Sequence, residues 1–163
     1  MCSPERNASA AANTLAFHDT QLGFRIDYPQ DWQSTSPGTD KVVFANKEAA
    51  NGAYLGVDVY ALEGKQATAN RAMLKSLLEA DGKEPGYVLR SDIHAVRVAN
   101  RDALQVEYVY QNQDGVLFHA IGVAVSGNAV DATYLITFDA PETTFTNDRA
   151  TFERMLASFG IDS

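Results

Sequence analysis

The sequence predicts an α+β fold in which helices flank a central antiparallel β-sheet. Most of the chain alternates apolar and polar residues with the period of two that is typical of strands. In the second half, short turn signals separate successive segments of this kind, which favours antiparallel neighbours. Near the middle and at the C-terminus, the pattern changes to the 3.6-residue period of a helix.

The first part of the chain is expected to form strands. Residues 24–28 alternate apolar and charged side chains, and Pro29 ends this strand because proline cannot donate to a strand ladder. In the segment 54–62, Leu55 and Val57 belong to one apolar face. The expected strands cover residues 14–17, 24–28, 41–45 and 54–62.

A helix is predicted over residues 67–80, where good helix formers replace the alternating pattern. Thr68 is the expected N-cap, and Asp81-Gly82 ends the helix. One apolar stripe should face the sheet; it consists of Met73, Leu74, Leu77 and Leu78.

The second half predicts a meander followed by a second helix. Residues 116–126 are apolar on both faces, which indicates a central strand. The expected meander strands cover residues 87–99, 103–111, 116–126 and 132–138. The final helix has Thr146 or Asn147 as its N-cap and Gly160 as its C-cap. Its apolar stripe consists of Phe152, Met155, Leu156 and Phe159.

Composition limits the class of protein. A chain of 163 residues suits one domain, which we place at residues 14–163, and such a chain buries roughly 68–70% of its unfolded surface. With 45% hydrophobic residues it is too apolar to be disordered. A net charge of −8 argues against nucleic acid as a partner. The apolar run 116–125 is much shorter than the roughly 20 residues that cross a bilayer.

The single cysteine, Cys2, is informative through its position. It excludes an intramolecular disulfide and a cysteine-rich zinc site. Residues 8–13 have small side chains with little to bury, so we expect residues 1–13 to form a flexible tether. A cysteine at the head of such a tether resembles the lipid-modified end of a mature bacterial lipoprotein. We therefore predict that Cys2 carries lipid and anchors the domain outside the cytoplasm, in the periplasm or at the cell surface; the alternative is an ordinary cysteine in a cytosolic tail.

No catalytic, cofactor or metal motif stands out in the sequence. The histidines are isolated from one another and from Cys2, so no ligand spacing for a metal is present. No serine lies in a Gly-x-Ser-x-Gly turn, and no glycine-rich loop leads from a strand into a helix. We therefore expect no enzyme and no cofactor.

Three residues in the meander are candidates for a ligand or partner face: Glu107, Tyr108 and His119. Glu107 and Tyr108 are strand neighbours, so they point to opposite faces and cannot line the same pocket. His119 shares a strand face with apolar residues, which favours a satisfied, partly buried imidazole over a ligand. Glu107 is open to a simpler interpretation as a solvent-facing strand carboxylate.

The segment 23–32 reads Gly-Phe-Arg-Ile-Asp-Tyr-Pro-Gln-Asp-Trp. It resembles the G-F-x-x-x-Y-P-x-x-W opening of PsbP-like domains, including the DcrB-like bacterial lipoproteins. The segment 152–159, Phe-Glu-Arg-Met-Leu-Ala-Ser-Phe, is similar to their closing helix. The motif residues should be structural; they are Gly23, Phe24, Tyr28, Pro29 and Trp32. Gly23 can form the turn before the strand, Pro29 ends the strand, and Trp32 is expected in the core.

The resemblance implies a PsbP-like α-β-α sandwich and a mostly non-enzymatic family. Its members include proteins that support photosynthetic oxygen evolution, envelope lipoproteins and a binder of a nuclear-transport GTPase. We therefore predict a lipid-anchored, non-catalytic binding or assembly module that acts on an envelope or membrane protein complex. The alternative is a carrier of a small ligand or metal, with a pocket between sheet and helix.

Overall fold

The computed structural model describes residues 13–46, 51–61, 66–127 and 132–162. Cys2 and nearly all of the expected tether lie outside these ranges. The described elements are β1 (Thr14–Asp19), β2 (Phe24–Pro29), β3 (Gln33–Thr35), β4 (Lys41–Ala45), β5 (Tyr54–Ala61), α2 (Gln66–Asp81), β6 (Val88–Val98), β7 (Arg101–Gln111), β8 (Leu117–Ser126), β9 (Ala132–Pro141), α3 (Phe145–Ser158) and β10 (Gly160–Ile161).

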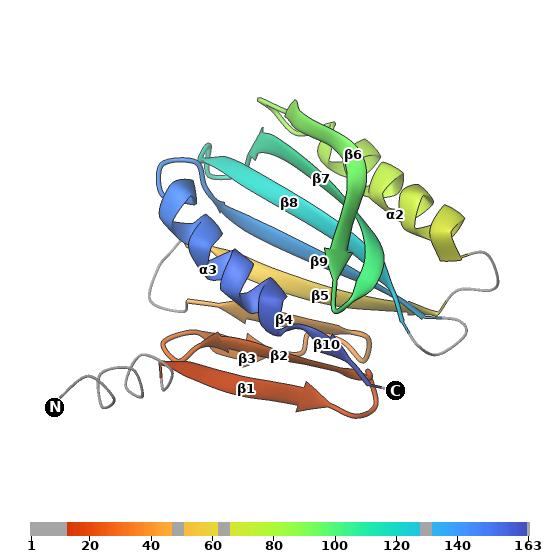
Figure 1. Cartoon of the computed structure of the whole chain (residues 1–163). Coiled ribbons are helices and arrows are strands. Elements are labelled where there is room, and N and C mark those ends of the chain that lie inside the picture. The colour runs from red at the N-terminus through yellow and green to blue at the C-terminus, as the bar shows by residue number, and fades with distance from the viewer. Residues whose placement is uncertain (1–12, 47–50, 62–65, 128–131, 163) are drawn as a thin grey trace, which may run out of the picture.

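The central layer is a seven-stranded antiparallel sheet with the order β3-β4-β5-β9-β8-β7-β6. The last meander strand, β9, returns to pair with β5 and so joins the two halves of the chain. A smaller sheet, β1-β2-β10, lies apart from it at the bottom of Figure 1. The α+β sandwich that the sequence predicts is thus confirmed.

The two helices cover opposite faces of the seven-stranded sheet, which we call the α2 face and the α3 face (Figure 1). On β8, Ile121 and Val123 point to the α3 face, whereas Ala124 packs with Leu74 on the α2 face. The helix α2 approaches closely at Gly122, where an added Cβ would come within 2.7 Å of a methyl group of Leu77. A larger residue here would require the side chain of Leu77 to shift.

The smaller sheet and α3 cover the α3 face together. Phe24 of β2 is 0% exposed and stacks on Phe159 with a ring distance of 5.7 Å. On β9, Phe138 stacks on Phe152 of α3 at 4.9 Å. This face therefore has a continuous aromatic core, which joins the two sheets and α3.

The opening motif lies at this junction. Gly23 has a positive φ of 78° in the turn before β2, a conformation that glycine adopts readily. Tyr28 packs on Phe44 with a ring distance of 4.9 Å, and Pro29 is the last residue of β2. Trp32 is partly buried and packs against the α3-face core rather than lying fully within it.

Some expected boundaries differ from the structure. The helix α2 begins at Gln66, so Thr68 lies inside it and is not the N-cap. The helix α3 begins at Phe145 with Thr144 as its N-cap, before both residues we expected. Gly160 does not form a helix C-cap with a left-handed backbone; it belongs to β10 and pairs with Arg25 of β2. At Gly160, pairing with β2 overrides the local glycine signal. Among the described residues, no helix is long and apolar enough to cross a membrane.

Candidate functional site

The sheet separates the three residues that the sequence singled out. Glu107 and His119 lie on the α3 face, on the neighbouring strands β7 and β8. Tyr108 lies on the α2 face, in the core under α2. The structure thus brings two of the candidates together and places the third in a different cluster.

His119 is 6% exposed and is held on both ring nitrogens. Its Nε2 lies 2.6 Å from Glu107 Oε2, and its Nδ1 lies 2.8 Å from Glu142 Oε2. The ring stacks on Phe145 at 3.5 Å between centroids, with only 4° between the planes. The imidazole is therefore fixed against the first turn of α3.

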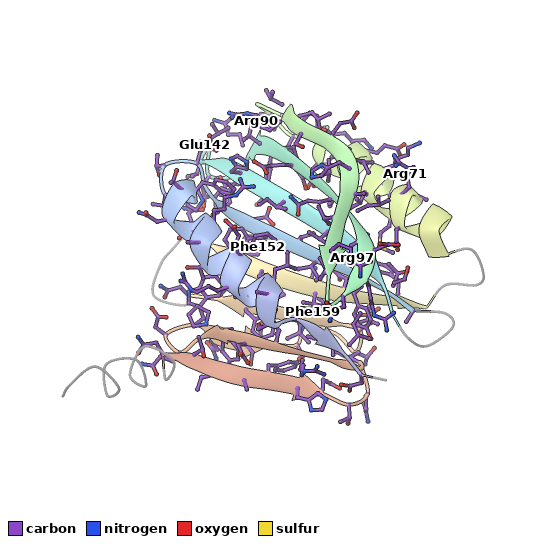
Figure 2. All side chains as sticks on the ribbon, in the orientation of Figure 1. Arg71, Arg90, Arg97, Glu142, Phe152 and Phe159 are labelled. Carbon is purple, nitrogen blue, oxygen red and sulfur yellow. The ribbon has the colours of Figure 1, made fainter. Side chains whose placement is uncertain are left out.

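Two arginines extend this cluster, which we call the His119 network. Arg149 of α3 donates to both carboxylate oxygens of Glu107, each at 3.2 Å. Arg90 of β6 lies 3.5 Å from Glu142, and Figure 2 shows this pair near the start of α3. Burial by itself raises the pKa of Glu107, but the hydrogen bonds from Arg149 and His119 outweigh burial and lower the pKa overall.

The hydrogen bonds of the His119 network are made largely within it. Its buried carboxylate and imidazole bond each other, and Arg149 donates to the carboxylate. Within the described residues, no group of three or more His, Cys, Asp or Glu side chains is arranged to hold a metal ion. The network joins β6, β7, β8 and α3 at one end of the sheet.

The α2 face holds a second cluster, built from tyrosines and aspartates. Tyr108 is 1% exposed, and its hydroxyl donates to the carboxylate of Asp81, the last residue of α2. Tyr110 donates to Asp139 Oδ2 at 2.6 Å. Tyr54 of β5 lies directly opposite Asp139 of β9 in the strand register. Four different elements therefore supply this cluster.

Burial dominates the electrostatics of the tyrosine–aspartate cluster. Asp139 is 6% exposed, and burial raises its pKa to about 7 even though hydrogen bonds from Tyr110 and Tyr54 oppose the shift. Burial, aided by the charge of Asp139, raises the pKa of Tyr54 to about 12. The pKa values of Tyr108 and Tyr110 rise for the same main reason. The tyrosines are therefore neutral donors at physiological pH.

A pocket of about 430 Å³ opens beside this cluster, and we call it the aromatic pocket. Tyr54 and Tyr110 supply aromatic walls, and each packs against the ring of Phe118, at 6.4 Å and 6.1 Å. The amides of Asn51 and Asn112 also line it and hydrogen-bond to each other at 2.8 Å. Ligand-binding pockets typically combine aromatic rings, which offer apolar contact, with a few polar groups that donate and accept hydrogen bonds.

Asp81 and Asp139 are not predicted by the sequence pattern to belong to a site. We expected the last meander strand to end at Phe138, which left Asp139 outside the sheet; the strand continues to Pro141. Asp81 was interpreted as a helix terminator, without a partner on β7. The spacing of tyrosines along β7 was the available signal, but their acidic partners are 27 and 29 residues away in sequence.

The chain matches one family model, and it shares its fold with several solved structures. A family model described as the serine/threonine kinase C-terminal domain, STK_strepto_C, matches residues 16–161. The comparison with curated proteins gives no match.

Several solved structures have the same fold at low sequence identity. Cyanobacterial PsbP (CyanoP) from Synechocystis has a TM-score of 0.67 at 18% identity, covering 92% of this chain and 93% of that chain. LpqN of Mycobacterium tuberculosis, described as involved in cell envelope biogenesis, has a TM-score of 0.67 at 13% identity, with coverage of 92% and 91%. The Ran-binding protein Mog1p of Saccharomyces cerevisiae has a TM-score of 0.61 at 12% identity, with coverage of 91% and 95%. These likenesses support the PsbP-like fold, whereas the DcrB-like lipoprotein resemblance is not confirmed.

Proposed function

We propose that the chain, which belongs to the family of serine/threonine kinase C-terminal domains, is a non-catalytic binding or assembly module. In this proposal, lipid on Cys2 anchors the module outside the cytoplasm, where it binds an envelope or membrane protein. The fold neighbours support the coarser part, because their names describe Ran binding and cell envelope biogenesis.

The observation that carries the proposal is the aromatic pocket. It lies on the α2 face, whose helix packs chiefly on β7, β8 and β9, while Tyr54 of β5 and Val43 of β4 line the pocket. Tyrosine is prominent among the residues that contribute most to protein interfaces, because its ring is large and its hydroxyl can bond. Here the rings stand on sheet strands, which hold them in place before a partner binds.

The anchor rests on Cys2 and the small residues that follow it. A single acyl chain holds a protein only marginally at a membrane, whereas two or more hold it stably. In cells that express the native gene, labelled fatty acid should enter the wild-type protein and remain with the membrane fraction. Cys2→Ser should abolish labelling and release the protein from that fraction. Retention of the label in the variant would contradict the anchor.

The partner is tested by crosslinking from the pocket itself. A photo-crosslinking amino acid in place of Asn112 reports on contacts at the pocket. The matched control carries the same photo-crosslinking amino acid in place of Glu153, an exposed residue of α3. We expect irradiation of intact cells to give a discrete protein adduct from position 112 and none of that size from position 153. Equal adducts from both positions, or none from 112, would contradict a partner at this pocket.

A second candidate function is the binding of a small ligand, which the size and lining of the same pocket favour. In this case, extraction of the purified native protein followed by mass spectrometry should yield a stoichiometric small molecule. The variant Tyr54→Ala should lose that molecule, whereas Tyr60→Ala, an exposed tyrosine on the same strand, should retain it. An extract without such a molecule leaves the protein partner as the better account.

A further inference from the structure

A second pocket, at the opposite end of the α2 face, carries an inference of its own. From its lining we infer that this arginine pocket binds a phosphate group, either free or in the headgroup of an anionic lipid. It has a volume of about 740 Å³ and lies between the first half of α2 and the β6–β7 hairpin. Because it shares no lining residue with the aromatic pocket, its failure would leave the proposed function unchanged.

Positive charge is concentrated here in a chain whose net charge is −8. Arg71 comes from α2, Arg97 from β6 and Arg101 from β7; Figure 2 shows Arg71 on the helix and Arg97 at the lower end of β6. Asp102 is the one carboxylate among the lining residues. On the α2 side of the hairpin, the side chains of Arg71 and Arg97 outnumber the single acid, which leaves an excess of positive charge.

The three arginines make few and weak polar contacts with other described residues. Arg97 bonds Asp102 at 2.7 Å, but both side chains are strongly exposed, so this pair is weak. Arg101 makes a long contact of 3.4 Å to the carbonyl oxygen of Ser126. Arg71 is exposed and has no ion pair with a described residue. Their donors remain available to an incoming anion.

A buried polar side chain also lines this pocket. Asn70 is 4% exposed; its Nδ2 donates to Ser126 Oγ at 3.1 Å, and its Oδ1 has no partner among the described residues. Thr133, opposite Ser126 in the register, likewise has an unpartnered hydroxyl. Buried polar groups without partners are costly and rare. If the Asn70 amide rotates by 180°, Ser126 donates to Oδ1 and Nδ2 becomes a further donor for an anion.

The backbone of the hairpin holds Arg97 in place. Ala99 and Asn100 form its turn with left-handed φ values of 52° and 60°. This conformation is disfavoured for alanine, so the surrounding structure must hold it. Across the tip, Arg97 lies opposite Asp102 on the α2 side, whereas Arg101 lies opposite Val98, whose side chain belongs to the α3-face core. Donors that are held in place before binding lose less entropy when an anion arrives.

Phosphate is the ligand chemistry that suits these donors. A guanidinium group presents parallel N–H donors that match two oxygens of a phosphate, and it keeps its charge at any physiological pH. Arginines that approach from a helix and from a hairpin can contact different oxygens of one tetrahedral group.

The first experiment is a titration of the unlipidated 163-residue chain with inorganic phosphate, followed by NMR at low salt. We expect saturable shifts at Asn70 and Ser126 in the wild-type protein. Arg71→Gln and Arg97→Gln should each weaken binding by about tenfold or more. Arg90→Gln, which removes one charge outside the pocket, is the matched control and should bind as the wild type does. No saturation, or equal weakening in Arg90→Gln, would overturn the proposal.

A second arm separates the two sources of the phosphate. Vesicles of phosphatidylglycerol, with phosphatidylcholine vesicles as the control, are floated with the same variants. Binding of the wild type but not of Arg71→Gln to phosphatidylglycerol would identify a lipid headgroup, and phosphate binding without vesicle binding would identify a soluble source. Vesicle binding that Arg71→Gln leaves intact, without phosphate binding, would contradict the site.

Asn70→Asp tests the buried amide with almost no change in volume. The new carboxylate should repel phosphate and abolish the shifts at Ser126, while far-UV circular dichroism checks that the variant folds. If this buried change unfolds the chain, the exposed Arg71→Gln still decides the matter. Unchanged phosphate affinity in a folded Asn70→Asp would remove Asn70 from the site.

Discussion

The two faces of the seven-stranded sheet are built differently. The α3 face is covered by α3 and by the β1-β2-β10 sheet. Its core is a set of stacked aromatic rings, and the ion pairs of the His119 network lie at one end. The α2 face is covered by one helix, carries tyrosine–aspartate hydrogen bonds and has a pocket at either end. In our proposals the α3 face chiefly stabilises the fold, whereas the α2 face carries the two proposed binding sites.

The largest expected effect lies in the α3-face core. Phe24→Ala should lower the free energy of unfolding by about 3–5 kcal/mol, because Phe24 is fully buried and its removal leaves a cavity among Phe17, Tyr134 and Phe159. Urea denaturation measures this loss. Tyr60→Ala on the α2 face should have a much smaller effect, since Tyr60 is 40% exposed. Similar losses in the two variants would show that the burial of Phe24 does not account for the effect.

The His119 network should contribute less than the aromatic core. Glu107→Gln is expected to cost about 1–3 kcal/mol at neutral pH, because it weakens the bonds to buried His119 and to Arg149, which is itself partly screened by solvent. The folded-state pKa of Glu107 is lowered, so this stability is present above its unfolded pKa near 4.5 and is lost as the pH falls through the folded value.

Urea titrations at several pH values should therefore show the wild type and Glu107→Gln converging in acid. Asp102→Asn, in the exposed pair with Arg97, is the control and should change stability little. A constant difference between wild type and Glu107→Gln from neutral to acid pH would show that the charge of Glu107 is not involved.

Asp139 should give the opposite pH dependence on the α2 face. Its pKa is raised from 3.8 to about 7, so the folded state binds a proton that the unfolded state releases between these values. Stability should therefore decrease as the pH rises from about 4 to about 7, relative to Asp139→Asn, which cannot ionise. Thermal unfolding across this range measures the difference. If the two proteins have parallel profiles, Asp139 has an ordinary pKa.

The smallest effect on stability is expected at the rim of the aromatic pocket. Asn51→Gly removes one exposed side-chain hydrogen bond, to Asn112, and glycine tolerates the positive φ of 57° at this position, so the free energy of unfolding should change by no more than about 0.5 kcal/mol. It should nevertheless weaken crosslinking of the partner from a neighbouring photo-reactive position in the pocket. A large loss of stability with unchanged partner binding would assign Asn51 to the fold instead.

The sequence predicted the architecture well where the signal was local. Alternation along β7 placed Glu107 and Tyr108 on opposite faces, and the stripe in α2 identified Leu74 and Leu77 as residues that face the sheet. Helix ends were less accurate, because the pairing of Gly160 with Arg25 of β2 outweighed the glycine signal for a helix cap. The clusters were not predicted, since each depends on residues from distant elements.

What the sequence determined by itself was therefore the class of fold, the helices and the face of the sheet on which each strand residue lies, because side-chain periodicity is a local property. The tertiary structure decided which residues meet. Tyr110 reaches Asp139 only because β8 pairs with both β7 and β9, and His119 meets Glu142 only because α3 begins just after β9 ends. Periodicity assigns a side chain to a face, whereas its neighbours on that face depend on strand order and register, which are set by the packing of the whole chain.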